Sequence, residues 1–143
     1  GEALSWFPLS LPYAILVVAP DIHIPTRDAY ASVVPGQHEG ADNLRALLLQ
    51  HLDHPDLLKN VLHNDFERPV FRANPAIALI REELYGCGAD VALLSGSGSA
   101  MFSIFSDGRM AAEAAVRFED RHRVFLTGPG FKPDLRITER AID

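Results

Sequence analysis

Residues 90–105 read DVALLSGSGSAMFSIF, in which two apolar runs flank a centre made of glycine and serine. Both runs are rich in the aliphatic and aromatic residues that favour strands. The connection between them, Ser95–Ser99, is too short to carry the chain across a sheet to a parallel neighbour. The segment therefore predicts an antiparallel hairpin with strands over 90–94 and 100–105.

Two further strand patterns lie on either side of this hairpin. Tyr13–Ala19 is short, rich in β-branched residues and bounded by prolines, which is typical of a strand buried on both faces. Arg123–Thr127 predicts the last strand, and the alanine-rich run Met110–Phe118 predicts a helix between it and the hairpin. The sheet is therefore expected to have four strands.

Helical patterns fill the long connection between the first strand and the hairpin. Thr26 is expected to cap one helix and Asp42 a second, while two short helical stretches follow between residues 55 and 73. Asn74 is predicted to cap a helix over Pro75–Gly86, since proline is favoured in the first helical turn and glycine at the end. The helix that Asp42 is expected to cap has an apolar face made of Leu44, Leu47, Leu48 and Leu52.

The order of these elements predicts an α+β fold. A strand, several helices, a hairpin, a helix and a final strand suit a ferredoxin-like antiparallel sheet with helices on one face, elaborated by extra helices. A length of 143 residues fits one domain, so residues 1–143 are expected to form a single unit. The weak periodicity of residues 131–143 predicts a disordered tail.

Composition narrows the classes of function. The formal net charge is −6, which disfavours binding to nucleic acid or to an anionic membrane surface. The longest apolar run, Tyr13–Pro20, is too short to cross a bilayer. A single cysteine, Cys87, favours a reducing compartment and hence the cytoplasm. Because the chain begins at Gly1 rather than methionine, we expect a processed protein or a piece of a longer one.

The loop between the hairpin strands is the strongest candidate for chemistry. Glycine lets backbone N–H groups approach an anion closely, and serine hydroxyls can donate as well, so the loop could hold a phosphate. No Gly-Lys-Ser/Thr follows it, and Met101 stands where a dinucleotide fingerprint needs its third glycine. From the residues alone, a phosphate contact and a plain flexible turn both stay open. The loop residues are Ser95, Gly96, Ser97, Gly98 and Ser99.

Other reactive side chains favour structural roles. His51 and His54 can share a helix face, but Pro55 interrupts the helix and no third ligand is evident, so no metal site is predicted. Asp65 and Glu67 stand where a helix starts and are interpreted as caps. Cys87 has no basic neighbour in the sequence and is expected to be inert. We assign no catalytic residue to this chain.

Several motifs, in this order, resemble the C-terminal half of the 4-diphosphocytidyl-2-C-methyl-D-erythritol kinases. This family belongs to the superfamily of galactokinase, homoserine kinase, mevalonate kinase and phosphomevalonate kinase, abbreviated GHMP. The resemblance covers residues 1 to about 130. The motifs are Val18-Ala19-Pro20-Asp21-Ile22-His23-Ile24-Pro25-Thr26-Arg27-Asp28-Ala29-Tyr30, Leu62-His63-Asn64-Asp65-Phe66-Glu67, Asn74-Pro75-Ala76-Ile77, Gly88-Ala89 and Leu94-Ser95-Gly96-Ser97-Gly98-Ser99-Ala100-Met101-Phe102.

The resemblance implies a kinase of the methylerythritol phosphate route to isoprenoids. Such an enzyme transfers the γ-phosphoryl group of ATP, with magnesium, to the 2-hydroxyl of 4-diphosphocytidyl-2-C-methyl-D-erythritol. In the family, the turn matched by Ser95–Ser99 faces the phosphate end of the site, and the segment matched by Thr26 and Tyr30 lies along the cytidine pocket. An aromatic side chain stacks on the base there, and Tyr30 suits that role.

One departure limits what this chain can do alone. The family's glycine-rich ATP loop, catalytic aspartate and active-site lysine belong to an N-terminal lobe, and no segment here matches them. We therefore expect the chain to be an inactive C-terminal lobe that needs the N-terminal lobe of the same protein. Two alternatives stay open, namely a stand-alone ferredoxin-like ligand-binding or regulatory module and another GHMP small-molecule kinase.

Overall fold

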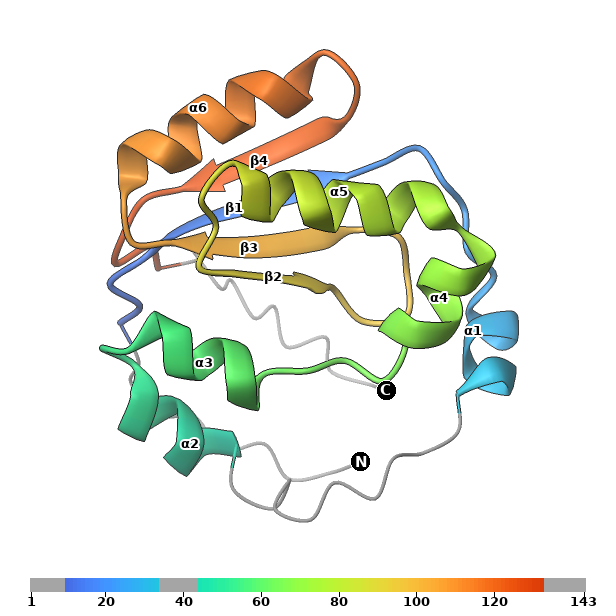
Figure 1. Cartoon of the computed structure of the whole chain (residues 1–143), viewed down its shortest axis with the longest axis horizontal. Helices are drawn as coiled ribbons and strands as arrows, with labels where there is room; N and C mark the ends of the chain where they lie inside the picture. Colours follow the sequence, from blue (N-terminus) through green and yellow to red (C-terminus); the bar gives the residue numbers. More distant parts are fainter. Residues whose placement is uncertain (1–9, 34–43, 133–143) are drawn as a thin grey trace, which may run out of the picture.

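The computed structural model describes residues 10–33 and 44–132 (Figure 1). The helices and strands of the described part are, in chain order, β1 (Ala14–Ala19), α1 (Thr26–Ser32), α2 (Leu44–His51), α3 (Pro55–Val61), α4 (Glu67–Ala73), α5 (Pro75–Gly86), β2 (Val91–Leu94), β3 (Met101–Phe105), α6 (Gly108–Glu119) and β4 (Arg123–Thr127). The predicted cap Asp42 and most of the predicted disordered tail, from residue 133 on, lie outside the described residues.

The strands form one antiparallel sheet in the order β2-β3-β1-β4. β1 is therefore a central strand, and its neighbours come from the other end of the chain: Leu16 is opposite Ser103 of β3 and Leu126 of β4. The hairpin connects β2 and β3 as the length of its loop predicted, with Leu94 opposite Met101. This strand order confirms the predicted ferredoxin-like α+β fold.

Helices α5 and α6 cover one face of the sheet (Figure 1). Their inward side chains and those of this sheet face make the main core, in which Phe105 and Phe118 are fully buried. Both helices have clear ends. Asp107 accepts a hydrogen bond from the Arg109 N–H at the start of α6 (2.8 Å), and Gly88, after α5, adopts a φ of +90°. The buried members of this core are Ala14, Leu16, Val18, Val70, Ile77, Ile80, Leu84, Ala89, Ala92, Leu94, Met101, Phe105, Ala111, Ala114 and Phe118.

The opposite face of the sheet packs against the extra helices α2 and α3. Leu58 of α3 is buried there against Val91 and Ile104, two residues that are paired across β2 and β3. The hydroxyl of Tyr13, just before β1, donates a hydrogen bond to the Leu52 carbonyl at the end of α2. The additional helices predicted between the first strand and the hairpin thus form a second, smaller core.

Burial along β1 corrects the prediction of a strand buried on both faces. Ala14, Leu16 and Val18 are buried, whereas the alternate residues are half-buried. Each side of the strand is apolar, so the composition looked like that of a doubly covered strand. The extra helices nevertheless leave part of the second face accessible.

Two predicted helix caps are also wrong in their details. Thr26 is the first residue of α1 rather than its cap, because Pro25 occupies the cap position without a side-chain hydrogen bond. Asn74 does precede α5, and Pro75 opens that helix as predicted, but the Asn74 amide donates to the Val70 carbonyl of α4 at 3.4 Å instead of capping α5. Proline at the first helical position favours the start of α5, because its fixed φ suits a helix.

Within the described ranges, no helix combines the length and the apolar character that a membrane span requires.

Candidate functional site

The glycine-serine loop, Ser95–Ser99, joins β2 to β3 at the end of the sheet where α1 and α4 lie (Figure 1). The Ser95 N–H donates to the Ala100 carbonyl at 2.8 Å and closes the loop at its base. Gly96 has a φ of +64°, a conformation that favours glycine. A Cβ placed on Gly96 or on Gly98 would meet no atom within 4 Å, so the space beside both glycines is open.

Asn64 ties this loop to the segment before α4. Its side-chain Nδ2 donates to the carbonyls of Leu94 and Gly96, each at 2.8 Å. Its Oδ1 accepts from the Phe66 N–H at 2.9 Å, which is the Asx turn that this residue type favours. One amide side chain therefore forms the turn just before α4 and also holds the loop.

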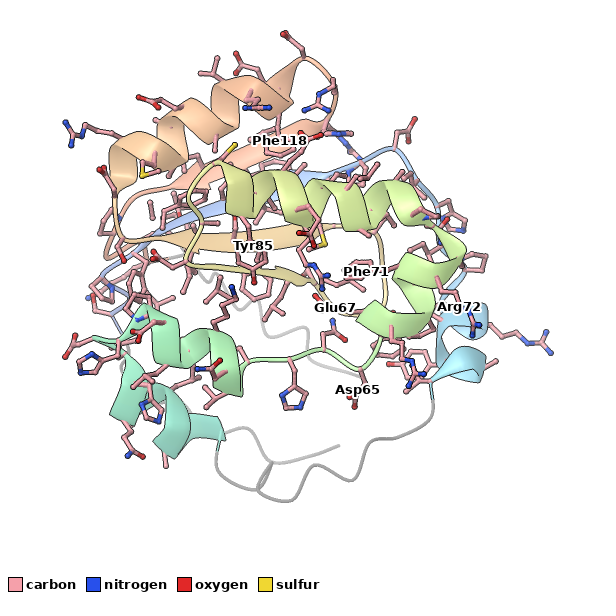
Figure 2. All side chains as sticks on the ribbon, viewed as in Figure 1. Asp65, Glu67, Phe71, Arg72, Tyr85 and Phe118 are labelled. Atoms are coloured by element: carbon pink, nitrogen blue, oxygen red, sulfur yellow. The ribbon has the colours of Figure 1, made fainter. Side chains whose placement is uncertain are left out.

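Glu67 makes a second connection to the same strand. Its Oε1 accepts from the Leu94 N–H at 2.8 Å, and its Oε2 lies 3.3 Å from Nη1 of Arg81 on α5. Figure 2 shows Glu67 between α4 and the end of β2, whereas Asp65 points away from the sheet. The interpretation of Glu67 as a helix cap is wrong, since its carboxylate binds a strand that lies 27 residues further along the chain.

A cavity of about 320 Å³ opens beside these contacts. Its wall is mostly apolar, with Asn64 and Asp65 at the polar side. Residues around Asn64 and residues of the hairpin line this one cavity, although the two segments are far apart in sequence. Its lining residues are Leu62, His63, Asn64, Asp65, Phe66, Leu93, Leu94 and Phe102.

Phe66 connects this cavity to Tyr30 of α1. The two rings pack edge to face, with centroids 4.9 Å apart and planes at 72°. Tyr30 is 64% exposed, so most of its ring is open to a ligand. Thr26 is exposed at the start of α1, next to a second cavity of about 360 Å³ to which Pro25 and Ala29 contribute. The structure thus brings Tyr30, Phe66 and the loop to one end of the molecule.

The remaining reactive side chains lie elsewhere. His51 ends α2 and His54 precedes α3, and no group of three or more histidine, cysteine, aspartate or glutamate side chains able to hold a metal ion occurs in the described part of the chain. Cys87 is half-buried at the end of α5. Burial lowers the pKa of His122, which lies against Phe118 and whose Nδ1 is buried without a hydrogen-bond partner among the described residues.

The roles of Asn64 and Glu67 toward the loop were not predicted from the sequence. Their partners Leu94 and Gly96 are 27 to 32 residues away, and a contact between a side chain and a distant backbone leaves no periodic pattern. The sequence held one signal for these roles: residues 64–67, Asn-Asp-Phe-Glu, and the glycine-serine loop both belong to the motifs that resemble one family.

Comparisons with known proteins agree on one family. The family model described as GHMP kinases C terminal matches residues 44–122. Proteins named 4-diphosphocytidyl-2-C-methyl-D-erythritol kinase are similar to most of this chain. The one from Chlorobaculum parvum is 33% identical over 92% of this chain and 46% of its own length. The one from Bacteroides fragilis is 37% identical over 83% and 43%, respectively. The chain spans about half the length of the curated relatives it matches.

Solved structures show the same similarity. A crystal structure of 4-(cytidine 5'-diphospho)-2C-methyl-D-erythritol kinase superposes with a TM-score of 0.67 at 27% identity, and the match covers 88% of this chain and 46% of the other. The homoserine kinase from Cytophaga hutchinsonii superposes with a TM-score of 0.56 at 15% identity, over 86% of this chain and 44% of the other, and supports the fold alone.

Proposed function

Since the chain belongs to the GHMP kinases and matches the C-terminal domain of that family, we propose that it is the substrate-side lobe of a 4-diphosphocytidyl-2-C-methyl-D-erythritol kinase. The observation that carries this proposal is that an open glycine-serine loop and the exposed aromatic ring of Tyr30, which packs on Phe66, lie at the same end of the molecule (Figure 1). The relatives of that name, which are about twice as long, support the choice of substrate.

In the proposed reaction, the 2-hydroxyl oxygen of the substrate forms a bond to the γ-phosphorus of ATP. The bond from that phosphorus to its bridging oxygen breaks, ADP leaves and the hydroxyl proton is released. Such a transfer depends on positioning and on stabilisation of charge. In this lobe, N–H groups of residues 96–99 and the serine hydroxyls of the loop bind phosphate oxygens, because the Ser95 N–H already donates to the Ala100 carbonyl. The open space beside Gly96 and Gly98 allows close approach.

Tyr30 is proposed to stack on the cytosine ring of the substrate. Its exposed ring is fixed on one side by Phe66, which reduces the conformational freedom that is lost on binding. Thr26, four residues earlier on the same helix, offers a hydroxyl toward the same ligand. These assignments place the base of the substrate at α1 and the phosphoryl group transferred from ATP at the loop.

ATP and magnesium fit this lobe only in part. The loop suits phosphate oxygens, but the described residues contain no cluster of acidic side chains for a divalent cation. We therefore propose that an N-terminal lobe of the same protein holds magnesium, most of the nucleotide and the residues that act on the hydroxyl. This chain alone is then inactive. A cytoplasmic location is proposed as well, supported by the single unpaired cysteine.

Calorimetric titration tests the proposal. The cytidylyl substrate and magnesium ATP are titrated separately into this chain and into a protein that carries both lobes. We expect the two-lobed protein to bind both ligands and this chain to bind the substrate at least about tenfold more weakly. Equal affinity of both proteins for the substrate would support a stand-alone module. Preference for another small alcohol would point to a different GHMP kinase.

A further inference from the structure

We propose that Asn64 and Glu67 are positioning residues that orient the Ser97 N–H of the glycine-serine loop toward the transferred phosphate. The proposal rests on the proposed function, since it names the residues that hold the loop in the geometry needed to bind phosphate. It rests on hydrogen bonds that join Asn64 to the end of β2 and to the loop, and Glu67 to the end of β2.

The outer edge of β2 is covered by side chains rather than by another strand. The Tyr85 hydroxyl bonds both backbone groups of Ala92, accepting from the N–H at 3.2 Å and donating to the carbonyl at 3.3 Å. Glu67 accepts from the Leu94 N–H, and Asn64 donates to the Leu94 carbonyl. Edge strands usually leave such groups to water. Here the series of bonds continues past the strand and ends on the Gly96 carbonyl.

The bond to Gly96 determines where the next N–H points. The Gly96 carbonyl and the Ser97 N–H belong to one planar trans peptide, so they point in opposite directions. When Asn64 holds the carbonyl, the Ser97 N–H is directed away from Asn64. Within the described residues this N–H has no hydrogen-bond partner, and it is therefore available to an anion.

Glu67 holds the base of the same loop. The Leu94–Ser95 peptide is fixed through the Leu94 carbonyl by Asn64 and through the Ser95 N–H by Ala100. Glu67 fixes the preceding peptide through the Leu94 N–H, and the ion pair with Arg81 holds the carboxylate in place. Its side chain is only 15% exposed, so water competes little for this contact.

The first test measures loop order in this chain by 15N relaxation. Asn64→Asp keeps the Oδ1 that accepts from Phe66 but removes both donors to the loop, whereas Asn60→Asp makes the same change on the exposed face of α3. In the wild type and in Asn60→Asp, order parameters at Gly96 and Ser97 should be about 0.85. In Asn64→Asp they should fall below about 0.6. A loop that is mobile in the wild type, or unchanged in Asn64→Asp, overturns the proposal.

The second test measures kinetics in the two-lobed protein. Asn64→Asp should lower kcat about 10- to 100-fold, as expected for a misplaced charge-stabilising donor, with the KM for the cytidylyl substrate within about twofold. Glu67→Leu should lower kcat in the same way, and Glu67→Gln, which keeps an oxygen for the Leu94 N–H, should restore most of it.

Two outcomes of the kinetic test contradict the positioning role. An unchanged kcat in both Asn64→Asp and Glu67→Leu would do so, as would a rise in the substrate KM that accounts for the whole loss. If Asn64→Asp does not fold, the pair Glu67→Leu and Glu67→Gln decides through the same relaxation and kinetic measurements. A folded, two-lobed wild type without kinase activity would contradict the proposed function, while the relaxation data on loop order would still stand.

Discussion

Gly96 and Gly98 are two residues apart in the same loop, but the backbone requires glycine at only one of them. Gly96 has positive φ, where a side chain is strained, whereas Gly98 does not. Both positions have room for a Cβ. The structure therefore gives no folding reason for glycine at position 98, and the proposed function supplies one, namely the close approach of a ligand.

Alanine substitutions separate these two reasons. Gly96→Ala should lower the free energy of unfolding by about 1–2 kcal/mol, because it forces alanine into the left-handed region. Gly98→Ala should change that free energy by less than about 0.5 kcal/mol, yet lower kcat of the two-lobed protein at least about tenfold. Urea unfolding and initial-rate kinetics measure both effects. Gly128→Ala is the matched control, because a Cβ at that position also has no atom within 4 Å. Full activity in Gly98→Ala would show that the loop is only a turn.

Tyr30 provides the second prediction at this scale. Tyr30→Ala should raise the KM for the cytidylyl substrate about tenfold in the two-lobed protein, because stacking on a base contributes about 1–3 kcal/mol. The KM for ATP should stay nearly unchanged, and Tyr30→Phe should retain the wild-type values. Phe125→Ala removes another exposed aromatic ring, on β4, and serves as the control. An unchanged substrate KM in Tyr30→Ala would exclude the stacking role.

At the scale of elements, the edge strand β2 depends on a hydroxyl group from α5. Ala92 is fully buried, and both of its outward backbone groups are bonded to Tyr85. The ring of Tyr85 also lies 4.3 Å from the Lys59 ammonium of α3. Tyr85 thus connects α5, β2 and α3 through one side chain.

Removal of that hydroxyl should weaken the edge. Tyr85→Phe keeps the ring but leaves the Ala92 N–H and carbonyl unsatisfied, so the free energy of unfolding should fall by about 1–3 kcal/mol. Tyr30→Phe removes a hydroxyl from a largely exposed side chain and should change the free energy by less than about 0.5 kcal/mol. Urea denaturation of both variants gives the comparison. Equal stabilities would show that water replaces the Tyr85 hydroxyl without cost.

The elements differ in how well the sequence predicted them. The hairpin followed from the short connection at Ser95–Ser99, and β4 was predicted with the observed bounds, Arg123–Thr127. The fold class followed from their order. The sequence did not predict how far β1 is buried or which groups Glu67 contacts. Both depend on which distant segment packs against a residue rather than on the residue's own neighbours.

At the scale of the whole molecule, one half-buried histidine links stability to pH. Burial lowers the pKa of His122, and the positive charge of Arg121 lowers it further, while Glu83 opposes these effects. The unfolded chain, in which the histidine has its ordinary pKa near 6.5, then binds a proton more readily than the folded one. His122 therefore favours the folded state above pH 6.5, and this contribution is lost as the pH falls through the lowered value.

The prediction concerns unfolding measured at two pH values. Between pH 7.5 and 5.5, the wild type should lose more free energy of unfolding than His122→Gln, which cannot be protonated in this range. His54→Gln removes an exposed histidine and should behave like the wild type. Arg121 lowers the pKa of Glu83, so that carboxylate titrates below this interval and does not contribute. Equal losses in the wild type and in His122→Gln would contradict the assignment.

The central position of β1 has a consequence during synthesis of the chain. Val18 pairs with Met101 and Val124, so this apolar strand has no sheet partner until more than 80 further residues have been translated. At about 5–20 residues per second, that delay lasts roughly 4–17 s. During this time the strand AILVVA has no sheet partner, so we expect the rate of translation to influence how much of the protein reaches its fold.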